Sequence, residues 1–176
     1  MKVLVFAGAL FAAAATTASA AAPDPAAKIY ADALTSFCTP WLKGQATRGA
    51  LAATAKAGGW DNVADAAFNR SGPWGFVTVQ AAEQADGKRT CSAFLRTEVT
   101  PWSTADAETR ATAWVTRTFP QAAKTVDHRA LTIDAGPTVA TRWVDSGTGL
   151  QITFATMAAK QSEPLSDVLL QVAPPS

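Results

Sequence analysis

The feature that most constrains this fold is a pair of cysteines, Cys38 and Cys91, which are the only two in the chain of 176 residues. In an oxidising compartment, two lone thiols most simply pair with each other. A Cys38–Cys91 disulfide closes a loop of about fifty residues and would stabilise the fold by ~4 kcal/mol on the chain-entropy model. We therefore expect the segment around Cys38 to pack against the segment around Cys91.

The first twenty residues have the layout of a secretory signal peptide. Met1-Lys2 is a short positive start, Val3 to Ala15 is an almost unbroken apolar run, and small residues lead to Ala20. The run is shorter than the ~20 apolar residues of a membrane span. We expect cleavage after Ala20, which leaves residues 21–176 as a single domain that is secreted or periplasmic and has no transmembrane segment.

The charge of the chain argues against a nucleic-acid partner. Its Lys and Arg residues number 15 and its Asp and Glu residues 14, which gives a formal net charge of +1. Lys2 would leave with the signal peptide, so the mature chain is formally neutral. A neutral chain without a basic run lacks the electrostatic footprint that attracts nucleic acid or an anionic membrane.

Helical spacing dominates the first half of the chain and recurs in one later segment. Asp24-Pro25 predicts a helix start. This helix should end before Thr39-Pro40, because proline disfavours the helical conformation at the preceding residue. Further helical segments are predicted at 47–58 and at 61–67, and a sequence that resembles a capping box at 103–106 opens a mid-chain helix.

An alternating pattern after Trp74 predicts a β-hairpin with strands at 74–81 and 90–97. A two-residue turn would set Val77 opposite Arg96. A three-residue turn with Gly87 in the left-handed conformation instead gathers apolar residues on the face of Cys91. We prefer this second register, which pairs two rows of residues: Val77, Val79 and Ala81 with Leu95, Ala93 and Cys91.

Three or four further strands are predicted after the mid-chain helix, at 126–133, 139–144, 150–155 and 168–172. The element order predicts an α+β domain: N-terminal helices and one mid-chain helix packed on an antiparallel sheet of five to six strands. In topology this order resembles the cystatin-like and NTF2-like families, in which helices cover one concave sheet.

A second resemblance is carried by three local features. The helix with Phe37-Cys38, the Gly59-Trp60 corner and the later cysteine strand resemble small exported bacterial proteins of uncharacterised function. This resemblance implies no catalytic residues.

His128 is the sole histidine and the main candidate for catalysis. Neighbouring side chains in a strand point to opposite faces, so we do not expect Asp127 to orient its imidazole. No Gly-x-Ser-x-Gly motif presents a nucleophile. One histidine and two paired cysteines cannot supply a typical zinc site, and no phosphate or dinucleotide motif occurs. We therefore predict no metal and no cofactor, with His128 a surface residue of a strand.

Tryptophan is the unusual residue type, with six in the chain. Trp114 and Trp143 follow apolar patterns that predict burial. The other four each lie beside proline or glycine at an element boundary: Trp41, Trp60, Trp74 and Trp102. Rings in such places can stack on sugars or take up an apolar ligand, or they can plug the ends of a small core.

The leading hypothesis is a small exported binding or interaction domain without catalytic activity. Its partner would be a glycan, an apolar ligand or a protein, bound through the four boundary tryptophans. One alternative is an exported, hydrolase-like enzyme with a pocket on the sheet face that uses His128 or a carboxylate. Another is an inhibitor of a secreted enzyme, by analogy to cystatin-like folds.

Overall fold

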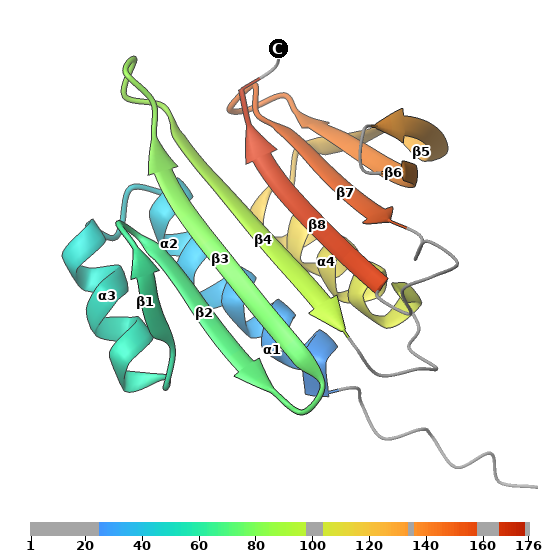
Figure 1. Ribbon diagram of the computed structural model, residues 1–176. Helices are drawn as coiled ribbons and strands as arrows, with labels where there is room; N and C mark the ends of the chain where they lie inside the picture. Colours follow the sequence, from blue (N-terminus) through green and yellow to red (C-terminus); the bar gives the residue numbers. More distant parts are fainter. Residues whose placement is uncertain (1–24, 98–103, 134–135, 158–165, 175–176) are drawn as a thin grey trace, which may run out of the picture.

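The computed structural model describes residues 25–97, 104–133, 136–157 and 166–174, so the expected signal peptide lies outside the described residues. The described strands form one antiparallel sheet in the order β1-β2-β3-β4-β8-β7-β6-β5 (Figure 1). Their bounds are β1 Asp61–Ala64, β2 Ala67–Gly72, β3 Gly75–Glu83, β4 Arg89–Thr97, β5 Ala122–Ile133, β6 Gly136–Asp145, β7 Gln151–Met157 and β8 Ser166–Ala173.

The helices cover one face of this sheet (Figure 1). The first helical segment runs without a break through α1 (Pro25–Ala33), a π-turn η1 (Leu34–Cys38) and α2 (Thr39–Leu42), and it packs on β3 and β4. Helix α4 (Thr104–Thr118) packs on β7 and β8, whereas α3 (Arg48–Ala57) lies against β1. Within the described ranges, no helix has the length and apolar character needed to span a membrane.

The eight-stranded sheet corrects the predicted fold class. We predicted a helix-rich first half above five to six strands, but the protein is mostly sheet. Residues 61–67, predicted to be helical, form the β1–β2 hairpin, and Ala66 adopts a left-handed φ of 51° between the two strands. All four residues of β1 are exposed. A strand without a buried face has no alternation of apolar and polar residues, so its sequence pattern gave no sign of it.

The π-turn corrects the predicted end of the first helix. Proline has no N–H, and its ring crowds the carbonyl four residues earlier. At Leu34 the helix widens, so that the Thr39 N–H donates to the carbonyl five residues back instead of four. The Thr39 hydroxyl donates to the same Leu34 carbonyl at 3.2 Å. The helix therefore continues through Pro40 and carries Cys38 and Trp41 onto the sheet.

The predicted register of the β3–β4 hairpin is confirmed. Gly87 has a φ of 80°, and its N–H donates to the Gln84 carbonyl to close the turn. The apolar residues of the two strands face each other as predicted and are buried beneath the helices: Val77 with Leu95, Val79 with Ala93 and Ala81 with Cys91. Burial beneath the helices selects this register, because a slip of one residue would expose the whole apolar row.

Candidate functional site

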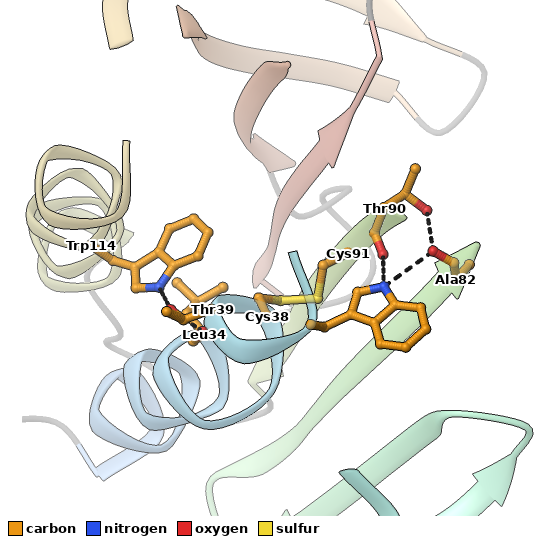
Figure 2. Close-up of a disulfide and its surroundings, with 8 residues drawn as sticks. Leu34, Cys38, Thr39, Ala82, Thr90, Cys91 and Trp114 are labelled. Atoms are coloured by element: carbon orange, nitrogen blue, oxygen red, sulfur yellow. Dashed lines mark hydrogen bonds between the residues drawn. A yellow bond between two sulfur atoms is a disulfide. The ribbon is translucent and has the colours of Figure 1, made fainter. Parts of the chain in front are cut away.

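The predicted disulfide joins Cys38 of η1 to Cys91 of β4 (Figure 2). Both cysteines are buried, with exposed fractions of 0% and 1%. A disulfide with a buried setting is compatible with an extracellular protein, because cytosolic thiols are kept reduced. Structurally, the bond fixes the first helical segment against the centre of the sheet.

Trp41 is buried beside this disulfide, with only 1% of its surface exposed. Its indole N–H lies 3.2 Å from the Ala82 carbonyl and 3.0 Å from the Thr90 carbonyl, which belong to the paired strands β3 and β4. The guanidinium of Arg89 lies 4.3 Å from the centre of its ring. Trp41 thus ties the end of α2 to the hairpin and leaves almost no surface for a ligand.

Trp114 and Trp143 are buried, as predicted, with 2% and 5% exposed. The Trp114 indole donates to the Thr39 hydroxyl at 2.9 Å, and that hydroxyl donates onward to the Leu34 carbonyl (Figure 2). This short chain of hydrogen bonds joins α4 to the π-turn. It satisfies the polar atoms that the widened helix brings into the core.

Trp60 differs from Trp41, because its indole is only half-buried and lines a surface cavity. The cavity has a volume of about 520 Å³ between the end of α3 and the start of β1. The apolar lining residues are buried or half-buried and form its wall, and the exposed polar lining residues form its rim. The wall consists of Ala52, Ala55 and Trp60, and the rim of Lys56, Asp61 and Asn62.

The position of the Trp60 ring follows from the glycine pair that ends α3. Gly59 has a φ of 70°, which lets the chain reverse so that the Trp60 N–H donates to the Ala55 carbonyl at 2.9 Å. A Cβ atom on Gly58 would lie 3.0 Å from Cδ1 of the ring, so the glycine allows the indole to lie against the helix end. Phe37 contacts the ring at 5.1 Å in an edge-on arrangement. The indole is therefore held rigidly at the cavity wall.

The other two boundary tryptophans are placed differently. Trp74 lies between β2 and β3, half-buried against the core. Trp102 lies outside the described residues. Of the described boundary tryptophans, Trp41 is a core residue, Trp74 sits in a turn, and Trp60 lines the cavity beside α3.

His128 is an exposed residue of β5, with 57% of its side chain accessible. Its Nε2 lies 2.8 Å from Oε1 of Glu108, on α4, and its Nδ1 lies 2.8 Å from Oδ1 of Asp127. We predicted that Asp127 would point to the opposite face and would not orient the imidazole, which was wrong, because its carboxylate contacts the ring. The pairing of β5 with β6 shifts register between Val126 and Arg129, and His128 has a left-handed φ of 47°, so the usual alternation of side chains is broken there.

The carboxylates around His128 change its protonation. Hydrogen bonding and charge from Glu108, followed by Asp127, raise the pKa of His128 above its ordinary value. Lys124, together with His128, lowers the pKa of Asp127. The protonated imidazole can donate from both nitrogens at once, whereas the neutral ring can donate from only one. The Glu108 contact was missed from sequence because α4 and β5 meet only in the folded chain.

Comparisons with known proteins give no relative for this chain. No family model, no curated protein and no solved structure matches it. The resemblances to cystatin-like and NTF2-like folds and to small exported bacterial proteins therefore stay predictions.

Proposed function

We propose that this chain is a small secreted or periplasmic binding domain without catalytic activity, and that the cavity beside Trp60 is its ligand site. The observation that carries the proposal is a rigidly held, half-buried indole that forms the wall of a cavity with a polar rim. Its volume of about 520 Å³ falls within the range of ordinary small-molecule sites.

The ligand that best fits this cavity is a neutral sugar ring. A pyranose has an apolar face of C–H groups and an edge of hydroxyl groups. The Trp60 indole offers a flat apolar surface for the C–H face of the sugar. Hydrogen-bond donors and acceptors for the hydroxyl groups come from Lys56, Asp61 and Asn62. The near-neutral charge of the chain favours an uncharged glycan over a strongly anionic one.

The surroundings of His128 support a role without catalysis. A histidine base needs a nitrogen that is free to take a proton from a substrate or nucleophile. Here Nε2 contacts Glu108 and Nδ1 contacts Asp127, so both nitrogens are engaged within the protein. This arrangement disfavours the hydrolase-like alternative. Export is supported by the buried Cys38–Cys91 disulfide together with the signal-like first twenty residues.

Calorimetric titration of the mature chain against neutral oligosaccharides and peptidoglycan fragments tests the proposal. We expect at least one glycan to bind, and Trp60→Ala to weaken that binding by about tenfold or more, because the apolar area of the indole that a sugar covers contributes about 1.5 kcal/mol or more. Trp74→Ala is the matched control and should bind as the unmodified chain does.

Asp61→Asn provides a milder test, because it alters the rim and leaves the indole in place. It should weaken binding by a smaller factor, with an unchanged circular dichroism spectrum. The proposal fails if no glycan binds, or if Trp60→Ala and Trp74→Ala bind equally well. Turnover of any titrated sugar would contradict the absence of catalysis.

A further inference from the structure

A second cavity, of about 360 Å³, opens where three segments distant in sequence meet. These segments are the end of α2, the C-terminal end of α4 and the turn between β6 and β7. Its lining is mainly apolar, with two charged residues. The residues that matter here are Leu42, Phe119, Pro120 and Leu150 for the apolar part, and Lys43 and Asp145 for the charged part.

Asp145 is the notable residue of this cavity, because it is a charged residue of which only 4% is exposed. Its Oδ2 accepts hydrogen bonds from the Thr148 N–H at 2.9 Å and from the Thr148 hydroxyl at 2.7 Å. These bonds hold the β6–β7 turn. They engage only one of the two carboxylate oxygens.

The second oxygen, Oδ1, accepts no hydrogen bond from the described part of the chain. Within the same described ranges, no Lys, Arg or His side chain lies within ion-pair distance of Asp145. Oδ1 is not among the fully buried polar atoms that lack a partner, and an accessible carboxylate oxygen accepts a stronger hydrogen bond from a cationic donor than from a neutral one. The cavity therefore has an anionic acceptor set beside an apolar wall.

We propose that this cavity binds a small amphipathic amine, whose ammonium group donates to Oδ1 of Asp145 and whose apolar body rests on Leu42, Phe119 and Leu150. The volume suits a compact ring or a short branched chain. The site is separate from the Trp60 cavity, with which it shares no lining residue, and it requires no bond to form or break.

Phenethylamine is the probe, and 2-phenylethanol is its neutral match, with the same ring and linker. Binding is followed by the backbone amide NMR signals of Thr148, Gly149 and Leu150. The total tryptophan emission gives a second readout, since the ring of Trp114 contacts Phe119 edge-on at 5.6 Å. We expect the amine to bind about tenfold more tightly than the alcohol, the usual scale for one charge-assisted hydrogen bond.

Two variants distinguish the contribution of the Asp145 charge to binding from that of the space in the cavity. Asp145→Asn keeps an oxygen acceptor for Thr148 but removes the charge, and it should make the amine and the alcohol bind equally. Thr118→Phe fills the cavity from the end of α4, where Thr118 lines it, and should abolish binding of both probes. Asp32→Asn, in an exposed ion pair with Lys28 on α1, is the control and should change neither affinity.

The proposal is overturned by any of three results in the unmodified chain or its variants. The amine and the alcohol could bind with the same affinity, or the amine could keep its advantage in Asp145→Asn. The NMR signals of the β6–β7 turn could also stay unmoved at about 10 mM phenethylamine, above the ~1 mM Kd that a fragment of this size would show.

Discussion

The centre of the sheet and its β5 edge are stabilised in different ways. At the centre, a buried disulfide and the buried indole of Trp41 tie the first helical segment to β3 and β4. At the edge, β5 pairs irregularly with β6, and exposed charged contacts surround His128. The centre should therefore dominate the free energy of unfolding, while pH should act mainly through the edge.

Removal of the disulfide should have the largest effect. The double variant Cys38→Ala/Cys91→Ala loses the constraint on the unfolded chain, which corresponds to about 4 kcal/mol for a loop of this length. Urea unfolding of the oxidised protein and the variant measures the difference. The unmodified protein under a strong reductant should approach the variant. A difference below about 1 kcal/mol would mean that the packing of the centre holds without the bond.

Trp41→Phe should have the next largest effect. It removes the N–H that serves the Ala82 and Thr90 carbonyls and also reduces buried volume, so we expect a loss of about 2 kcal/mol. Trp60→Phe is the matched substitution at a half-buried site without those bonds, and should cost less than about 1 kcal/mol. Equal urea midpoints for the two variants would contradict the distinction between core and cavity tryptophans.

The edge should respond to pH through His128. Its folded pKa is raised, so its contacts with Glu108 and Asp127 stabilise the protein fully below the unfolded pKa of about 6.5. That contribution is lost as the pH rises through the higher folded pKa. His128→Asn should flatten the change of the urea midpoint as the pH rises from about 6.5 through the higher folded pKa.

Glu108→Gln tests the same histidine, because it removes the larger of the two causes that raise the pKa of His128. Its pH dependence should be intermediate between those of the unmodified protein and His128→Asn. The lowered pKa of Asp127 acts in a different window: its contribution disappears as the pH falls through that value, well below neutrality. If the urea midpoint changed with pH in the same way in all three proteins, His128 would not contribute to the pH dependence of stability.

The smallest effect is expected at β1. Val63 is 58% exposed, and every residue of this strand faces solvent. Val63→Thr keeps the branched shape and should change the free energy of unfolding by no more than about 0.5 kcal/mol. A larger loss in the free energy of unfolding would show that Val63 makes stabilising contacts despite its exposure.

The same contrast explains what could be predicted from the sequence. The β3–β4 register was predictable because Val77, Val79 and Cys91 alternate with more polar residues and face a covered surface. The hairpin at 61–72 was not, because β1 has no buried row. The predicted end of the first helix before Thr39-Pro40 was wrong, because the π-turn lets the helix continue through the proline. That turn involves the Thr39 N–H and a hydrogen bond from Trp114 of α4, which the local sequence does not reveal.

The two candidate sites also differ in how far the sequence could predict them. Trp60 could be proposed from its place beside Gly59 at a predicted boundary, and the structure adds the cavity that it lines. The cavity at Asp145 could not, because Leu42, Phe119 and Leu150 come from segments that meet only in the folded chain. No local pattern joins residues so far apart in sequence.

The position of β8 has a consequence for how the chain reaches its folded state. The strands β1 to β4 and β5 to β7 form two antiparallel meanders, and β8, which follows both of them along the chain, lies between them and pairs with β4 and β7 (Figure 1). Until β8 (Ser166–Ala173) has been synthesised, the two halves lack the strand that joins them. A nascent chain stalled before Ser166 therefore holds two open seams, each with unpaired backbone groups along its length.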